Sequence, residues 1–463
     1  MDSSPTVFQA PAAAALRCPQ CLGDAPLDVT GSGWRCARCT TDYPRLGGLP
    51  WLLPAPQVRI VEWRQRYRLL ERELESGQQS IGERLRDPGL PAAGRDRLDR
   101  LRAGQAAQVA ELRALLAPLD PDGSIARLET LLALRTRTPL SQDLGSYYVN
   151  VHRDWCWGDA ENEASLRLVQ DLMAGIAPGR MLVPGAGAGR LAFDVHQAMA
   201  PTETFALDLN PLLAWIGARV AAGETVALHE FPVAPRSGAD VALARQLRAP
   251  EPARPGLHFV IGDALRAPLA GGSFDSVLTP WFVDIVAHPF AQVAAQVASL
   301  LRAGGTWVNF GSLSFNQRDP AACHGPREVV ELLESSGFEV VRTLDRELPY
   351  LQSPASRHAR LETVFGFAAR LREAAPAPAA LDNLPAWLGD PTQPVPLLPH
   401  FQAQALANRI VAFTLALIDG RRSLGQIAAY LVEQKLLLPG EAETAVRSFL
   451  VALYEEGQRR ARF

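Results

Sequence analysis

The stretch that decides the fold is MLVPGAGAGRLAFDV, residues 181–195. It begins with an apolar run of strand length, passes through a G-x-G-x-G turn made by Gly185, Gly187 and Gly189, and continues as a helical pattern. Glycines at such a turn let the backbone approach a ligand and leave the first amide groups of the helix free to bind its polar end. Alone, the pattern is also typical of an ordinary strand-to-helix turn or of a dinucleotide site.

A second strand signal follows about twenty residues later. The segment FALDLNP, residues 205–211, ends an apolar run with Asp208 and continues through Asn210 into the next helix. A carboxylate at that place can accept hydrogen bonds from the two hydroxyls of a ribose. We therefore expect Asp208 and Asn210 to bind a nucleoside-containing cofactor.

The next two segments add further strands and a helix to this alternating pattern. Residues 259–279, FVIGDALRAPLAGGSFDSVLT, end a third strand at Asp263 and Ala264, which are placed for an adenine, and open a fourth strand. Residues 299–311, SLLRAGGTWVNFG, add a helix, a glycine turn and another strand. The order resembles that of class I methyltransferases, which implies S-adenosylmethionine as cofactor and an α/β, Rossmann-like domain over residues 145–372. A nicotinamide enzyme would more typically carry G-x-G-x-x-G.

The composition is that of a globular protein with several domains. With 463 residues, 48% hydrophobic and 21% charged, the chain should form two to four domains. A net charge of −3 argues against nucleic acid as a partner, and Lys435, the only lysine, excludes a P-loop or Schiff-base lysine at the glycine turn. Without a signal peptide pattern or ~18 uninterrupted apolar residues, we expect a cytoplasmic protein with no membrane partner.

The cysteines near the N-terminus predict a metal site. Cys18, Cys21, Cys36 and Cys39 form C-x2-C-x14-C-x2-C, which brings four thiolates around one tetrahedral zinc. Four thiolates leave no open position for water or substrate, so the zinc is expected to be structural. The surrounding residues 16–54 resemble the small zinc-ribbon family that activates methyltransferases, which implies a scaffolding role in cis.

A narrower resemblance concerns the large domain. HRDWCWGDAENEASL (152–166), LVPGAGAGRLAFDV (182–195) and the stretch 278–313 resemble the carnosine N-methyltransferase family. The resemblance implies methylation of an imidazole nitrogen in a histidine-containing small molecule or peptide. The family has an aromatic-histidine pair after the strand that ends in GSL, whereas this chain has Phe315 and Asn316.

Further site residues are expected from the chain positions. Asp284 follows the fourth strand, where class I enzymes face the acceptor, and a carboxylate there can fix the imidazole tautomer and take its proton. The resemblance assigns Tyr350 as an approximate match to a tyrosine of the acceptor site. Arg153 would cover the cofactor, and Arg190 would meet its carboxylate. The structural alternative for Asp284 is an ion pair or a helix cap, and that for Arg153 and for Arg190 is a structural pair.

We expect six regions in the chain. They are a disordered N-terminus (1–15), a zinc ribbon (16–54), a helical connector (55–144), the methyltransferase domain (145–372), a Pro- and Ala-rich linker (373–400) and a winged-helix-like domain (401–463). The last region resembles PqqD-like peptide-binding domains, which implies a leader peptide or protein partner. Two other functions stay open: a methyltransferase for RNA or a translation protein, and a non-enzymatic binding module on a methyltransferase fold.

Overall fold

The computed structural model describes residues 15–23, 25–119, 144–286, 288–315, 317, 319–376, 392 and 394–460. Contacts divide the chain into two compact units, residues 1–381 and 382–463, called unit 1 and unit 2 below. Parts of the expected N-terminal, connector and linker regions, residues 1–14, 120–143 and 377–391, lie outside the described residues, as does Asn316.

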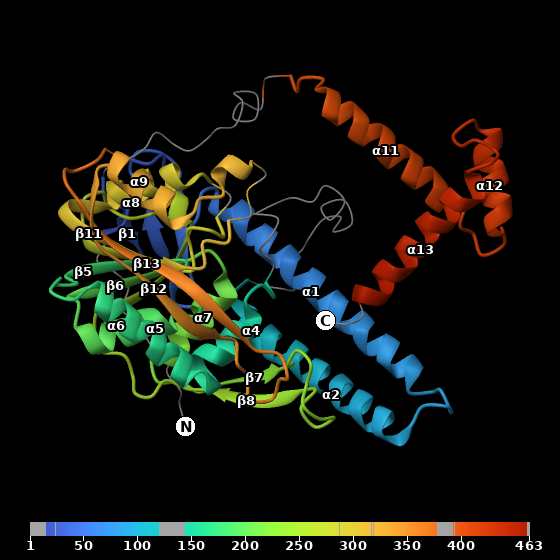
Figure 1. Ribbon diagram of the computed structural model, residues 1–463, viewed down its shortest axis with the longest axis horizontal. Helices are drawn as coiled ribbons and strands as arrows, with labels where there is room; N and C mark the ends of the chain where they lie inside the picture. The colour runs from blue at the N-terminus through green and yellow to red at the C-terminus, as the bar shows by residue number, and fades with distance from the viewer. Residues whose placement is uncertain are drawn as a thin grey trace. The chain divides into compact units, whose positions relative to one another are not determined.

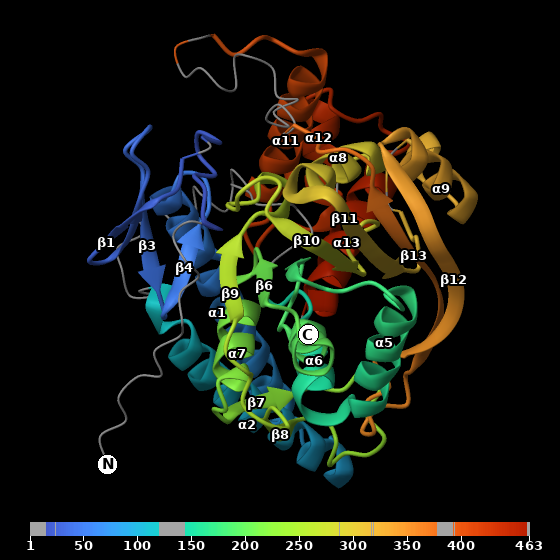
Figure 2. The ribbon, with the colours of Figure 1, turned by 90° about the vertical axis from the view of Figure 1, so that its left-hand side faces the viewer.

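Unit 1 is built on one large mixed sheet, in which the described strands follow the order β1-β2-β3-β4-β9-β6-β5-β10-β11-β13-β12 (Figures 1 and 2). Its main strands are β5 (Arg180–Pro184), β6 (Glu203–Asp208), β9 (Leu257–Gly262), β10 (Phe274–Pro280), β11 (Leu301–Gly311), β12 (Phe338–Tyr350) and β13 (Arg360–Leu371). Strands β9, β6, β5, β10 and β11 run parallel, and β13 is antiparallel to both neighbours. The predicted α/β, Rossmann-like fold is confirmed.

Helices cover both faces of this sheet (Figure 2). They are α5 (Asp159–Leu172), α6 (Arg190–Met199) and α7 (Pro211–Ala221) on one face, and α8 (Phe290–Leu300) and α9 (Pro326–Ser335) on the other. Alternate residues of β5 face the two cores: Met181 and Val183 pack in one, and Leu182 in the other. Burial on both faces explains why the central strands are continuous apolar runs in the sequence.

The zinc-ribbon region is part of the same sheet. Its strands are β1 (Asp28–Thr30), β2 (Gly33–Arg35), β3 (Asp42–Leu46) and β4 (Leu49–Leu52), which form an antiparallel series. Strand β4 then pairs in parallel with β9, with Trp51 opposite Ile261 and Leu52 opposite Gly262. Because Trp51 and Leu52 are fully buried, this junction is continuous with the core of unit 1.

The connector contributes two long helices, α1 (Pro56–Arg84) and α2 (Ala92–Leu115), which pack side by side (Figure 1). Trp63 and Tyr67 of α1 and Leu112 of α2 are buried in the core that also contains α5 to α7. Helix α2 also contacts the hairpin of β7 (Val226–Glu230) and β8 (Leu243–Leu247), where the Glu111 carboxylate accepts a hydrogen bond from the His229 amide.

Short helical elements complete unit 1. They are the 3-10 turns η2 (Ala117–Leu119), η4 (Ala264–Arg266) and η5 (Pro320–Ala322), the single turn α4 (Tyr148–His152), and the π-helical turn η3 (Arg153–Trp157) directly after it. A π-helical turn is rare and occurs mostly at functional sites. This one leads from α4 into α5 beside the glycine turn.

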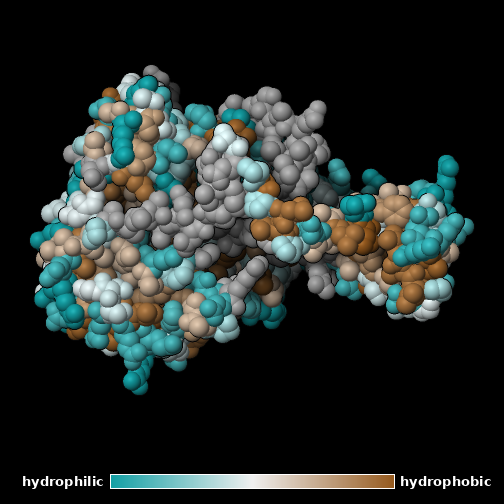
Figure 3. Space-filling view, turned by 90° about the horizontal axis from the view of Figure 1, so that it is seen from above, coloured by the Kyte–Doolittle hydropathy of each residue, from teal (hydrophilic) through white to brown (hydrophobic). Residues whose placement is uncertain are grey.

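Unit 2 consists of α11 (Pro399–Ala416), α12 (Leu424–Glu433) and α13 (Ala442–Arg460). The capping box at the start of α12 is formed, because the Ser423 hydroxyl accepts from the Gln426 amide and the Gln426 side chain accepts from the Ser423 amide. Residues 394–460 contain no strand that would make the wing of a winged helix. Apolar side chains of α11 such as Leu406 are exposed, and Figure 3 shows brown surface over this unit.

None of the helices in the described part of the chain combines the length and apolar character needed to cross a membrane.

Candidate functional site

A cavity of about 260 Å³ opens at the carboxyl ends of the parallel strands of unit 1. This is where the strand order reverses between β5 and β10, the place at which open α/β sheets bind ligands. Most of the predicted cofactor residues line it, namely Arg153, Gly185, Gly187, Arg190, Asp208, Asn210, Asp263 and Ala264. Tyr350 lines it as well, whereas Gly189 and Asp284 do not.

Two glycines of the glycine turn have different structural roles. Gly187 has a φ of 58°, and a Cβ atom built there would meet nothing within 4 Å, so a side chain would project into open space in the cavity. Gly189 has a φ of 79°, and its Cβ would come within 2.5 Å of the Phe259 ring. Both conformations favour glycine, but Gly187 leaves room for a ligand and Gly189 allows α6 to pack on the sheet.

Asp208 lies at the end of β6 with its carboxylate fixed by the backbone. Its Oδ2 accepts from the Gly187 amide at 2.7 Å, and its Oδ1 accepts from the Asn210 amide at 2.8 Å. Burial raises the pKa of Asp208 to about 6, although these backbone hydrogen bonds act in the opposite direction. A carboxylate held in this way on a cavity wall is a ready acceptor for ligand hydroxyls.

The residues after β6 and β9 serve partly as helix caps. The Asn210 side chain accepts from the Leu212 amide at 3.0 Å and begins α7. Asp263 accepts from the Leu265 amide at 2.9 Å and begins the 3-10 turn that contains Ala264. These local bonds fix the side chains where the strands end, so both residues reach the cavity wall with a defined orientation.

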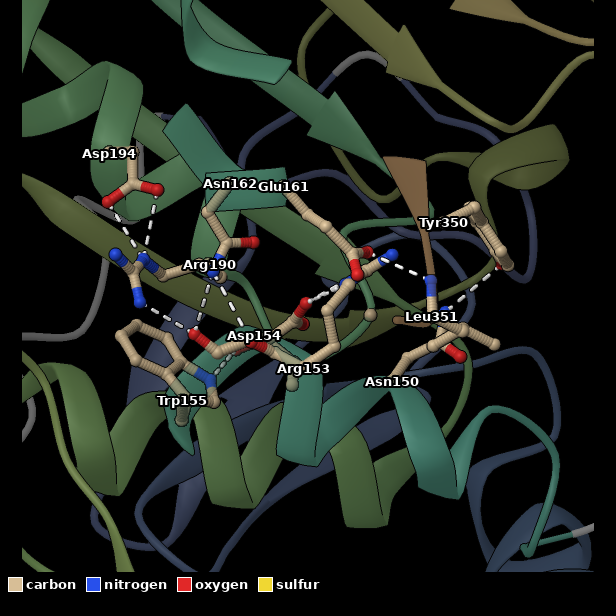
Figure 4. Close-up of polar contacts among 12 residues, drawn as sticks. Asn150, Arg153, Asp154, Trp155, Glu161, Asn162, Arg190, Asp194, Tyr350 and Leu351 are labelled. Carbon is tan, nitrogen blue, oxygen red and sulfur yellow. Dashed lines mark hydrogen bonds and ion pairs between the residues drawn. The ribbon is translucent and has the colours of Figure 1, made fainter. Parts of the chain in front are cut away.

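The π-helical turn brings a pair of charged residues into the cavity (Figure 4). The Arg153 guanidinium donates to Asp154 Oδ1 from Nε at 2.9 Å and from Nη2 at 2.6 Å. Its Cζ also lies 5.7 Å from the centre of the Tyr350 ring. Arg153 therefore connects Asp154 to the side of the cavity that Tyr350 forms.

Arg190 joins two parts of the wall (Figure 4). Its Nε donates to both carboxylate oxygens of Asp194 at 2.9 Å, and its Nη1 donates to the Asp154 carbonyl at 2.7 Å. The guanidinium also lies 5.5 Å from the Trp155 ring. These contacts attach α6 to the π-helical turn, which is the ion-pair alternative considered from the sequence.

One side of the cavity is aromatic. The rings of Trp281 and Tyr350 meet edge to face with their centres 5.1 Å apart, and Phe310 lies 5.9 Å from Trp281. Trp281 has a φ of 52°, a conformation that non-glycine residues adopt rarely and mostly at functional sites. Tyr147 completes this side, and burial together with the charges of Tyr350, Asp208 and Asp284 raises its pKa.

The loop after β10 carries both Asp284 and His288. The Asp284 side chain is 5% exposed, and its Oδ2 accepts from the Ser314 amide at 2.8 Å. His288 lines the cavity, and its Nδ1 is buried without a hydrogen-bond partner among the described residues. Asp284 thus ties this loop to the segment after β11, while His288 forms part of the cavity wall.

Sequence patterns did not single out several wall residues. They include Tyr147, Asn150, Glu161, Trp281 and His288. Trp281 had a usable signal, because it directly follows the strand β10 and strand ends build such sites. Glu161 had none: in the first turn of a helix, an acidic residue is an ordinary dipole-compensating choice.

The four cysteines of the ribbon lie together as predicted. Cys18 and Cys39 have their sulfurs 3.5 Å apart, and those of Cys21 and Cys36 are 3.7 Å apart. All four sulfurs lie within 4.8 Å of one another. Tetrahedral Zn–S bonds of about 2.3 Å require sulfur separations of about 3.8 Å, so the cluster fits a zinc ion.

The sequence matches no known protein-family model and no curated protein. The solved structures that resemble it include methyltransferases. N-methyltransferase NodS of Bradyrhizobium japonicum, in complex with S-adenosyl-L-homocysteine, has 14% identity and a TM-score of 0.33 over 50% of this chain and 98% of its own. A SAM-dependent methyltransferase of Methanosarcina mazei has 15% identity and a TM-score of 0.30 over 44% and 97%.

A third similar structure is the complex of the Haloferax volcanii Trm112 methyltransferase activator with its candidate methyltransferase. It has 13% identity and a TM-score of 0.33 over 51% of this chain and 100% of the other. At such identities the likenesses concern the fold alone.

Proposed function

We propose that this protein is an S-adenosylmethionine-dependent methyltransferase that methylates an imidazole nitrogen of a histidine-containing small molecule or peptide. The observation that carries the proposal is the wall made by Gly187 and Asp208, where open space beside a glycine adjoins a half-buried carboxylate at the end of β6. That combination fits the ribose of a nucleoside cofactor.

The cofactor side of the cavity is formed by residues from three strand ends. Asp208 would accept hydrogen bonds from the ribose hydroxyls, Asp263 would accept from the adenine amino group, and Gly187 would allow the ligand to approach the backbone. When bound, S-adenosylmethionine supplies a methyl group on a positively charged sulfur.

The acceptor side is suited to a flat ring that becomes positively charged. Trp281 offers an aromatic surface, and aromatic faces attract cations, whereas the Tyr350 ring already has the guanidinium groups of Arg153 and Arg360 over it. A lone pair on one imidazole nitrogen forms the new N–C bond as the C–S bond breaks, and the proton on the other nitrogen must then leave. Holding the ring in line between these aromatic residues lowers the entropy cost of that alignment.

Two residues are candidates to receive the proton. Asp284, the residue favoured by the sequence, has its Oδ2 bound to the Ser314 amide and lies outside the cavity lining. What supports His288 is its position in the cavity wall; because its Nδ1 is buried away from solvent, Nε2 is the ring nitrogen that would receive the proton. We therefore assign proton transfer to His288 and support of the loop to Asp284.

The experiment combines binding with product analysis. Calorimetry should show that S-adenosylmethionine binds the wild type and that Asp208→Ala or Gly187→Val abolishes binding. Mass spectrometry of reactions with histidine, histidine dipeptides and histidine-containing peptides should then show a gain of one methyl group on the imidazole. The absence of cofactor binding by the wild type would refute the enzyme, and transfer to a different class of acceptor would refute the imidazole.

The same assay separates the two proton acceptors. His288→Ala should abolish methyl transfer while the affinity for the cofactor stays unchanged. Asp284→Asn should lower activity less, because the amide can keep an oxygen toward the Ser314 N–H. If Asp284→Asn is inactive and His288→Ala is active, the assignment is reversed.

A further inference from the structure

The turn that follows Tyr350 is held by a carboxylate from a distant helix (Figure 4). Glu161, in the first turn of α5, accepts hydrogen bonds from the Leu351 amide at 2.9 Å and from the Gln352 amide at 2.7 Å. The Glu161 side chain also lines the cavity, and the residue is only 6% exposed. Both carboxylate oxygens are therefore engaged with the backbone directly after Tyr350.

The conformation of this turn requires such support. Leu351 has a φ of 52°, in the left-handed region that is sterically unfavourable for residues other than glycine. Hydrogen bonds to a buried charged acceptor are stronger than those to a neutral one, and two of them can offset this strain. Without Glu161, the two amides would be left without these acceptors beside a cavity wall.

A second buried carboxylate holds the same turn from the other side. The Ser353 hydroxyl donates to Glu230 Oε1 at 2.6 Å, and Glu230 is itself paired with Arg245 at 2.7 Å. Because Glu230 is only 1% exposed, this anchor is buried in the β7–β8 hairpin. The turn is thus fixed between α5 and the hairpin, and Glu161 is the anchor nearer to the tyrosine.

The side chain of Tyr350 depends on this turn for its position. Asn150 Nδ2 donates to the Tyr350 hydroxyl at 3.4 Å, a long hydrogen bond, and the other contacts are with the Trp281 ring and the Arg153 and Arg360 guanidinium groups. The side chain is thus held by ring contacts and one long hydrogen bond. Its placement also depends on the main chain on both sides of it: β12, where Tyr350 pairs with Arg360 of β13, and the turn that Glu161 holds.

We propose that Glu161 is a positioning residue, which fixes Tyr350 in the acceptor wall and acts on the affinity for the acceptor but not on that for the cofactor. The consequence for acceptor affinity rests on the proposed function. The claim that Glu161 holds the turn does not rest on the proposed function, because its hydrogen bonds to the turn exist irrespective of the reaction. Glu161 would thus determine specificity although it makes no bond to the reacting atoms.

The test compares Glu161→Gln with Asp171→Asn in the full-length protein. Asp171 lies at the other end of α5, where it pairs with Arg346 of β12 at 2.7 Å, so it is a control carboxylate that joins the same helix to the strand before the turn. Hydrogen exchange measured by mass spectrometry should become roughly tenfold faster in the peptide containing Leu351 and Gln352 for Glu161→Gln. It should not change for Asp171→Asn.

Binding and kinetics then separate positioning from direct contact. The dissociation constant for S-adenosylmethionine should stay within about twofold of wild type in Glu161→Gln. With the histidine dipeptide that the wild type methylates, KM should rise roughly tenfold and kcat should change less. In a Tyr350→Ala background, Glu161→Gln should add no further effect on KM, because its influence passes through the tyrosine.

Three results would overturn the proposal. Unchanged exchange at Leu351 and Gln352 would show that Glu161 does not hold the turn. Loss of cofactor binding comparable to that of Asp208→Ala would make Glu161 a cofactor ligand. If the effects of Glu161→Gln and Tyr350→Ala on KM were additive, Glu161 would not act through the tyrosine. If the wild type binds no S-adenosylmethionine, the proposed function fails, and the exchange comparison still decides whether Glu161 positions the turn.

Discussion

The zinc ribbon and unit 2 are both small attachments in sequence, but they differ in how they complete their cores. The ribbon places β4 beside β9, and its buried Trp51 and Leu52 share the core of the large sheet. Among the described residues of unit 2, the buried core consists of Leu417, Ile427, Ala428, Leu431, Ala442 and Val446. A small unit gains stability by lending a strand to a larger sheet, whereas the buried core of unit 2 is formed by side chains of its own helices and turns.

The ribbon also lies close to the ligand cavity. Strand β9, to which it is paired, ends at Gly262 and is followed by Asp263 and Ala264 in the cavity wall. Arg266, in the next turn, donates to the carbonyls of Pro19 and Gln20 at 3.2 and 3.1 Å. The comparison therefore predicts that ribbon defects reach the cofactor site and that unit 2 defects do not.

The largest effect should follow disruption of the cysteine cluster, which fits a zinc ion. Cys36→Ser removes one thiolate from the cluster, and because zinc binding energy is folding energy for a small metal domain, we expect unit 1 to lose several kcal/mol of stability. Affinity for S-adenosylmethionine should fall with it. Thermal unfolding and zinc content by atomic absorption measure both, with exposed Cys323→Ser as the control. An unchanged melting temperature after zinc loss would contradict the shared core.

Trp51→Ala tests the junction without touching the metal ligands. Trp51 is fully buried between the ribbon and the sheet, and truncating a buried tryptophan destabilises by about 3–5 kcal/mol. We expect a lower denaturation midpoint for unit 1 with zinc retained at one ion per chain. A small effect, below about 1 kcal/mol, would show that β4 contributes little to the sheet.

The pH dependence of cofactor binding tests Asp208 in the cavity wall, and not the ribbon that packs against the sheet. Since burial raises the pKa of Asp208 to about 6, lowering the pH through 6 protonates the carboxylate. Affinity for S-adenosylmethionine should then fall, approaching tenfold per pH unit well below this pKa. Asp208→Asn should bind weakly and with a flatter pH dependence. A profile in the wild type without a step near pH 6 would contradict the assignment.

The raised pKa of Asp208 affects folding stability in the opposite direction. Cofactor affinity should rise with pH, whereas the stability that this group contributes should fall. The folded protein binds this proton more tightly than the unfolded chain, whose carboxyl has the ordinary value near 3.8. The contribution of Asp208 to stability is therefore lost as pH rises from about 4 to about 6 and is largest below that range. The difference between the denaturant midpoints of the wild type and of Asp208→Asn should therefore decrease as the pH rises from about 4 to about 6.

The smallest effect should come from removing unit 2. A chain ending at Leu381 keeps the whole of unit 1, so its melting temperature should stay within about 2 °C and its cofactor affinity within about twofold. Calorimetry on both chains tests this. A large loss of stability or cofactor binding would mean that unit 2 supports the catalytic unit as the ribbon does.

Sequence alone determined the parts of this protein that depend on local patterns. The C-x2-C pairs gave the cysteine cluster because ligand spacing is a local property, and the strand–glycine–helix series gave the α/β fold because buried parallel strands are continuous apolar runs. The predicted residues at strand ends, Asp208 and Asp263, meet in one cavity because parallel strands end on the same edge of the sheet.

Only the tertiary structure decided the rest. Pairing of β4 with β9 joins residues about 210 positions apart in the chain, and edge-strand pairing has no sequence signature of its own. The contact of Glu161 with the turn after Tyr350, and the positions of Asp284 and His288 around one loop, likewise depend on which distant segments pack together. The acceptor side of the site is built from such contacts, whereas the cofactor side is built from strand ends.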